Sequence, residues 1–136
     1  MSMATSGGYA GDITPREAWD RLAAEPAAVL VDVRTAAEWA YVGVPLLTAI
    51  GKPTLLVEWD EFPSGPVPDF VGRLAAELDK IGATRDAPLF FICRSGTRSR
   101  HAAIAATAAG FTQAFNILHG FEGRLDAARH RGTQES

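Results

Sequence analysis

Residues 89–99 read LFFICRSGTRS, and this stretch decides the fold of the 136-residue chain. Its first four residues, 89–92, are apolar and partly aromatic, which is typical of a strand buried on both faces of a parallel sheet. Cys93 and a glycine-containing loop follow directly. The alanine-rich segment 97–109 then predicts a helix that ends at Gly110. A strand, a short loop and a helix in this order indicate one unit of an open α/β sheet.

The flanking sequence repeats this alternation of strands and helices. Thr14, Pro15 and Glu17 have the spacing of a helix N-cap, a first-turn proline and a capping box. Apolar residues recur at helical spacing over 69–81, just before Gly82. Short apolar runs predict three further strands, at 29–33, 54–57 and 114–118. We therefore expect a three-layer α/β/α fold with a mostly parallel central sheet of about five strands.

The remaining segments set the expected boundaries of the domain. We expect a short helix within 35–39 and a loop at 63–68, which is rich in glycine and proline. The domain is expected to span 12–128, between a flexible segment at 1–11 and a polar tail at 129–136. The length and the 47% share of hydrophobic residues fit one domain with a sizeable core.

Composition narrows the partners that the chain can have. Its 13 Lys and Arg against 16 Asp and Glu give a formal net charge of −3, so a global positive field for nucleic acid or an acidic membrane is missing. No apolar stretch approaches the roughly 20 residues that span a bilayer, and the start does not resemble a signal peptide. One cysteine and three widely spaced histidines argue against a zinc site. We expect a cytoplasmic protein with no metal, cofactor, membrane or nucleic-acid partner.

The loop after Cys93 has the composition of an anion-binding site. Backbone N–H groups between a strand and a helix can point inward at the positive end of the helix, and Arg94 and Arg98 add positive charge. This environment favours the ionised, nucleophilic form of a cysteine. The alternative is a buried and inert thiol, which is the commoner state of a free cysteine. The two arginines, the hydroxyl residues and the glycine of the loop favour the reactive interpretation.

Residues 93–99, Cys-Arg-Ser-Gly-Thr-Arg-Ser, resemble the active-site loop of single-domain rhodaneses, whose pattern is Cys-Arg-Ser-Gly-x-Arg-Ser. The Asp-Val-Arg of 32–34, followed by Glu38-Trp39, resembles the signature on the first core strand of that family. The resemblance runs from about Ile13 to about Gly123. It implies a sulfurtransferase that takes sulfur from a small anionic donor such as thiosulfate, holds it as a persulfide, and passes it to an outside thiol, cyanide or carrier protein.

The same resemblance implies a role for each residue of the site. Cys93 would be the nucleophile, and six residues would form the cradle for the sulfur: Arg94, Ser95, Gly96, Thr97, Arg98 and Ser99. Asp32 and Arg34 are expected to brace the loop through hydrogen bonds and ion pairs, and Glu38 could similarly hold an arginine. For these three residues an ordinary strand-end or surface charge is an equal alternative.

The sequence also bears on the surroundings of the site, through two aromatic residues and one turn. Trp59 and Phe62 follow the strand predicted at 54–57, so they share a sheet edge with Cys93 if the strands are parallel. We expect them to wall the pocket, and closure of the core beneath a loop is the alternative. The turn that carries a histidine in the family reads Gly-Val-Pro-Leu at 43–46. The chain therefore resembles a divergent branch of the family. The surface that contacts the sulfur acceptor in other members is not assigned to this chain by resemblance.

Three other functions remain as alternatives. Cysteine-dependent phosphatases need a histidine before the cysteine and an arginine six positions after it, whereas Ile92 and Ser99 occupy these positions. Arg98, five positions after the cysteine, matches the shorter loop of sulfurtransferases. A cysteine hydrolase would need a histidine base, and His101 follows on the helix of the loop itself. A non-catalytic interaction module is the third alternative, and such modules often lack the cysteine that this chain keeps.

Overall fold

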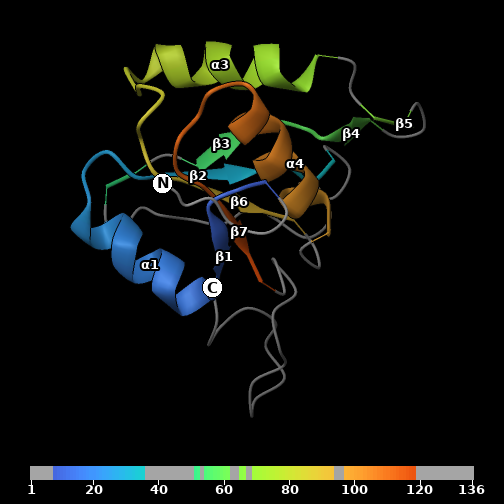
Figure 1. Cartoon of the computed structure of the whole chain (residues 1–136). Helices are drawn as coiled ribbons and strands as arrows, with labels where there is room; N and C mark the ends of the chain where they lie inside the picture. Colours follow the sequence, from blue (N-terminus) through green and yellow to red (C-terminus); the bar gives the residue numbers. More distant parts are fainter. Residues whose placement is uncertain are drawn as a thin grey trace.

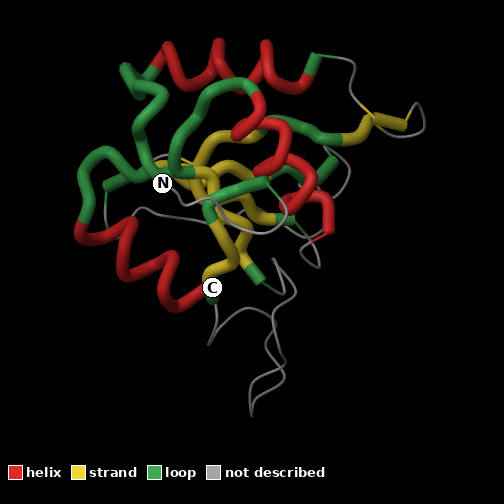
Figure 2. The backbone as a smooth tube through the Cα atoms, in the orientation of Figure 1, coloured by secondary structure: helices red, strands yellow, loops and turns green. Residues whose placement is uncertain are grey.

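The structure, a computed structural model, describes residues 8–35, 51–52, 54–61, 65–66, 69–93 and 97–118. Within these ranges the helices are α1 (Pro15–Ala24), α3 (Phe70–Lys80) and α4 (Thr97–Ala108). The strands are β1 (Gly11–Ile13), β2 (Val29–Asp32), β3 (Thr54–Leu56), β4 (Asp60–Glu61), β5 (Gly65–Pro66), β6 (Leu89–Ile92) and β7 (Ala114–Ile117). Figure 2 shows the strands at the centre of the chain and the helices around them.

Five strands form one sheet in the order β1-β7-β6-β2-β3, and every pairing within it is parallel. β6 lies in the middle, paired with β2 on one side and β7 on the other. Ile92, its last residue, is in register with Asp32 of β2, and Phe91 is in register with Asn116 of β7. The carboxyl ends of the three central strands therefore meet at one edge. The predicted parallel sheet is confirmed.

Hydrophobic side chains pack on both faces of this sheet. Because successive residues of a strand point to opposite faces, Val31 and Phe91 belong to the cluster under α3 and α4. Leu30 and Phe90 belong to a second cluster that packs with α1. Figure 1 shows α1 on one side of the sheet and α3 and α4 on the other. This arrangement confirms the predicted three layers.

Local signals account for the bounds of two helices. The Thr14 side chain accepts from the Glu17 N–H (3.1 Å), and the Glu17 carboxylate accepts from the Thr14 N–H (2.9 Å), so the predicted capping box is present. Hydrogen bonding of the Glu17 carboxylate to the backbone N–H and the side chain of Thr14 lowers the pKa of Glu17. Asp69 caps α3 by accepting from the Gly72 N–H, and Gly82 follows the helix with a positive φ of 73°. The helices predicted from these signals are confirmed.

Strand β1 is a feature that the sequence did not predict. Its three residues are too few to show a hydrophobic period, and only pairing with β7 defines them as a strand. The Ala10 N–H donates to the Ala114 carbonyl (2.9 Å), and Tyr9 is buried. Tyr9 and Ala10 are therefore part of the packed structure.

The segment expected to be a loop at 63–68 contains β5, which pairs antiparallel with β4. A two-residue pairing carries no pattern that sequence analysis can detect, and a proline is tolerated at such an edge. The short helix expected within 35–39 falls almost wholly outside the described residues. The segments 1–7 and 119–136 lie outside them as well.

Helix α4 offers a direct test of this packing. Ala103 is fully buried in the cluster under α4, whereas Ala108 on the same helix is exposed. Ala103→Leu should lower the free energy of unfolding by about 1–3 kcal/mol, because the extra methylenes must push α4 from the sheet. Ala108→Leu should change it by less than about 0.5 kcal/mol. Urea unfolding of both variants measures the difference, and equal stabilities would contradict the arrangement of α4.

Candidate active site

Cys93 lies at the carboxyl edge of the sheet, directly after β6. It is 1% exposed and belongs to the hydrophobic cluster under α3 and α4. The chain after β2 runs alongside, because the Val33 N–H donates to the Ile92 carbonyl (2.9 Å). The carboxyl edge of a parallel sheet is where open α/β folds place their ligands. Cys93 therefore occupies a position suited to chemistry as well as to packing.

The first turn of α4 lies against the sulfur. Ser99 Oγ is 3.3 Å from Cys93 Sγ, and Ser99 is fully buried. Thr97 is the first residue of the helix and is exposed, and Arg98 is half-buried. Because a helix carries a partial positive charge at its amino terminus, this turn favours negative charge nearby. Arg94, Ser95 and Gly96 of the proposed cradle lie outside the described residues.

A chain of buried and partly buried hydrogen bonds leads from this serine across the sheet. Ser99 Oγ donates to Asn116 Oδ1 (2.5 Å), and Asn116 Nδ2 donates to Asp12 Oδ1 (3.0 Å). The same Asp12 oxygen accepts from the Tyr9 hydroxyl (2.7 Å). Four side chains from α4, β7, β1 and the segment before β1 thus connect to Cys93. Asn116, Asp12 and Tyr9 were not among the site residues predicted from the sequence.

A signal for Asn116 was nevertheless present. It is a polar residue inside the apolar run predicted as a strand at 114–118, and it is 3% exposed. Because a buried amide must find hydrogen-bond partners, such a residue indicates a polar contact inside the fold. Its partners Ser99 and Asp12 come from distant parts of the sequence, so the pattern alone could not name them.

Asp32 and Arg34 form a buried ion pair at the end of β2. Asp32 Oδ2 accepts from Arg34 Nη2 (2.7 Å), and Oδ1 accepts from the Arg34 backbone N–H and Nε (3.0 Å each). Both residues are essentially unexposed. Since a buried charge is costly without a partner, the Asp32 carboxylate depends on Arg34. The pair stands beside the β6 edge, because Asp32 is in register with Ile92.

Trp59 lies on the face of the sheet that carries Cys93. It is half-buried against the cluster under α3 and α4, and its backbone N–H donates to the Val33 carbonyl (3.1 Å). Its ring meets Phe70 edge-on at 5.0 Å and lies 6.3 Å from the His101 ring. These contacts fit the core-closing alternative and leave the pocket-wall role a prediction. Phe62 and Glu38 lie outside the described residues.

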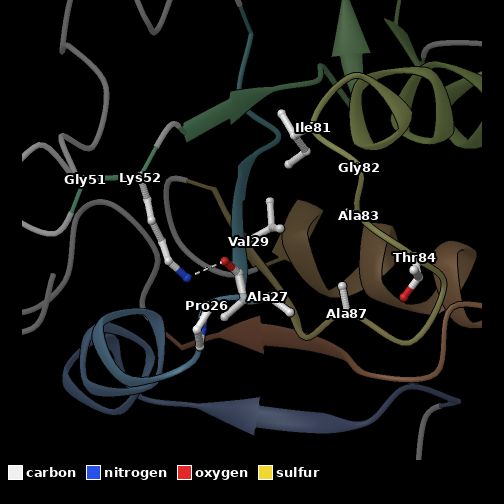
Figure 3. Close-up of a pocket in the computed structure, with 11 residues that line it drawn as sticks. Pro26, Ala27, Val29, Gly51, Lys52, Ile81, Gly82, Ala83, Thr84 and Ala87 are labelled. Atoms are coloured by element: carbon white, nitrogen blue, oxygen red, sulfur yellow. Dashed lines mark hydrogen bonds between the residues drawn. The ribbon is translucent and has the colours of Figure 1, made fainter.

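A cavity opens at the opposite edge of the sheet. It has a volume of about 550 Å³ and lies beside Val29 and Ala87, where β2 and β6 begin (Figure 3). Lys52 is its charged residue, and its Nζ donates to the carbonyls of Glu25 (2.6 Å) and Ala28 (2.7 Å). Burial lowers the pKa of Lys52. Because the ammonium group donates to these two carbonyls, Lys52 anchors the segment that follows α1.

The described residues lack both a metal-binding cluster and a membrane-spanning helix. No group of three His, Cys, Asp or Glu side chains in this part of the chain is placed to hold a metal ion. None of the helices described above has the length and apolar character that crossing a membrane requires.

The chain is similar to a known protein family, to solved structures and to curated relatives. Residues 14–126 match the Rhodanese-like domain family. The crystal structure of Rv0390 from M. tuberculosis is similar, with 49% identity and a TM-score of 0.75 over 91% of this chain and 89% of that one. An uncharacterized protein of Rickettsia rickettsii is 39% identical over 113 residues, which cover 82% of this chain and 84% of the relative.

A further similar structure is the solution structure of the polysulfide-sulfur transferase homodimer from Wolinella succinogenes. It has 21% identity and a TM-score of 0.55, and the match covers 83% of this chain and 70% of that one. At this identity the likeness bears on the fold alone. The family match covers most of the sequence and includes the β6 edge with Cys93, and the chain therefore belongs to the rhodanese-like domain family.

Proposed function

We propose that the protein is a sulfurtransferase that carries sulfur as a persulfide on Cys93. The observation that supports this most is the placement of the sole cysteine, at the carboxyl edge of the sheet and 3.3 Å from a hydroxyl in the first turn of α4. Membership of the rhodanese-like family agrees with it.

The proposed reaction has two steps. The Cys93 thiolate attacks the outer sulfur of a donor such as thiosulfate, and a new S–S bond forms at Sγ. The S–S bond of the donor breaks, and its electron pair leaves with sulfite. In the second step an acceptor thiolate or cyanide attacks the outer sulfur of the persulfide, and the electron pair of that bond returns to Sγ. Each step exchanges one S–S bond for another bond to sulfur, so no external oxidant is needed.

The charges near the edge suit an anionic donor and an anionic intermediate. The amino terminus of α4 provides positive potential beside the sulfur, and Arg98 adds a positive charge to the same helical turn. Burial strengthens these interactions because the surroundings have a low dielectric constant. The cradle residues Arg94, Ser95 and Gly96 would add backbone N–H donors, as the resemblance of the loop implies.

The presence of a single cysteine limits how the sulfur can leave. Without a second thiol the chain cannot form an internal disulfide that would release it. Cys93 itself is 1% exposed, and a persulfide places the outer sulfur about 2 Å beyond Sγ. An outside thiol or carrier protein would therefore react with the outer sulfur rather than with the buried Sγ.

Intact-mass analysis tests the proposed intermediate. After treatment with thiosulfate the protein should gain the mass of one sulfur atom, because Cys93 retains the outer sulfur of the donor. Addition of cyanide should remove it and produce thiocyanate. Cys93→Ser should show no gain under the same conditions.

Absence of the adduct with thiosulfate, polysulfide and persulfide donors alike would contradict the proposal. In that case, capture of the same protein partner by the native chain and by Cys93→Ala would favour the interaction-module alternative.

We further propose that the Asp32–Arg34 pair braces the β2 end beside Cys93. Arg34→Met should lower the free energy of unfolding by about 3–5 kcal/mol, because it leaves Asp32 charged and buried without this partner. Asp32→Leu/Arg34→Met should recover most of this loss. Lys80→Met removes the exposed pair with Glu77 and should cost less than about 1 kcal/mol. A similar cost for Lys80→Met and Arg34→Met in urea unfolding would refute the bracing role.

A further inference from the structure

Asn116 is a buried polar residue for which the sulfur-transfer reaction itself has no use. It lies on β7, in register with Asp12 of β1, to which its Nδ2 donates (3.0 Å). Its Oδ1 accepts from Ser99 Oγ (2.5 Å), and that oxygen is 3.3 Å from Cys93 Sγ. Asn116 is thus linked to the reactive sulfur through Ser99 alone.

The orientation of the Asn116 amide is fixed by its partner on β1. An ionised carboxylate only accepts hydrogen bonds, so the NH₂ group must face Asp12 and the oxygen must face Ser99. Tyr9 donates to the same carboxylate oxygen (2.7 Å). Burial and the adjacent Asp12 raise the pKa of Tyr9, so its hydroxyl keeps the proton at neutral pH. Nothing in this arrangement lets Asn116 donate to Ser99.

The Ser99 hydroxyl has a single proton, and the bond to Asn116 uses it. The side of Ser99 Oγ that faces Cys93 is therefore a lone pair. A neutral Cys93 thiol can donate to this lone pair across 3.3 Å. A thiolate cannot, and to gain the Ser99 proton it must compete with the Asn116 oxygen. The hydrogen-bond chain thus distinguishes between the two protonation states of the sulfur.

We propose that Asn116 is a positioning residue that holds the Ser99 proton away from Cys93 and thereby favours the sulfur-loaded site over the empty thiolate. The second half of this statement rests on the proposed function. In a persulfide the negative charge lies on the outer sulfur, and Sγ is bonded to two atoms and uncharged. Ser99 can then keep its bond to Asn116. Only the empty thiolate places its charge against the Ser99 lone pair.

Other charged groups also bear on Cys93, and the test must leave them unchanged. Asp32 and Arg34 lie at the end of the neighbouring strand β2, and Arg98 lies in the first turn of α4. Asp12 and Tyr9 stand at the far end of the hydrogen-bond chain. A substitution of Asn116 by an uncharged residue alters none of these charges, so its effect reports on the hydrogen bond.

The test is the pH profile for alkylation of sulfur-free Cys93 by iodoacetamide. Asn116→Leu removes the acceptor at similar volume, and Ser99 is then able to donate to the thiolate. The midpoint of the profile should move to lower pH by about half to one pH unit, the size expected for one ordinary hydrogen bond. In a Ser99→Ala background the same substitution should leave the midpoint in place, because Asn116 acts through Ser99.

Asp12 provides a second pair of variants on an exposed residue. Asp12→Ala releases the Asn116 amide, which can then turn its NH₂ group toward Ser99, so the midpoint should again move to lower pH. Asp12→Asn removes the same charge but keeps an oxygen that accepts from Asn116, so its shift should be smaller. If Asn116→Leu does not fold, this pair carries the test.

An unchanged or raised midpoint in the folded Asn116→Leu protein would overturn the inference, as would an equal shift in the Ser99→Ala background. For the Asp12 pair, equal shifts of Asp12→Ala and Asp12→Asn would overturn it. The result is independent of sulfur transfer. A lowered midpoint without any persulfide would leave the role of Asn116 intact and refute the proposed function, and a persulfide with no midpoint shift would do the reverse.

Discussion

The parallel pairing of β6 with β2 and β7 is the constraint on which the site depends. It aligns three strand ends, so that Cys93, the Asp32–Arg34 pair and Asn116 come to one edge from separate parts of the sequence. The buried apolar side chains of β6 hold this alignment, and α4 then directs its first turn against the sulfur. The cysteine is therefore buried and still lies where an α/β sheet receives ligands.

The Cys93 sulfur and the Asn116 amide oxygen compete for the single proton of the Ser99 hydroxyl. This competition connects the fold to the chemistry of Cys93. Ser99 Oγ lies between a sulfur at 3.3 Å and an amide oxygen at 2.5 Å, and it has one proton to give. The thermodynamic preference among thiol, thiolate and persulfide then depends on Asn116, which contacts none of the reacting atoms. Because its amide is oriented from β1, an edge strand of the sheet helps to set the state of the central cysteine.

Much of this could be predicted from sequence because the signals were local. The β6 run, the capping box at Thr14 and the glycine after α3 each act within a few residues, and the structure confirms the elements they predict. β1, β4 and β5 are defined as strands only by their pairing, so no local sequence pattern predicted them. The hydrogen-bond chain from Ser99 to Tyr9 depends on contacts across 104 positions between Asn116 and Asp12, which only the folded sheet creates.

The central claim is that Cys93 takes the outer sulfur of its donor. Thiosulfate labelled with ³⁵S in the outer position distinguishes this transfer from simple binding, because the two sulfur atoms of the donor have different fates. The account predicts that the label stays on the peptide containing Cys93 after gel filtration, that sulfite is released unlabelled, and that a thiol removes the label. Recovery of all the label in intact thiosulfate, with unmodified Cys93, would contradict it.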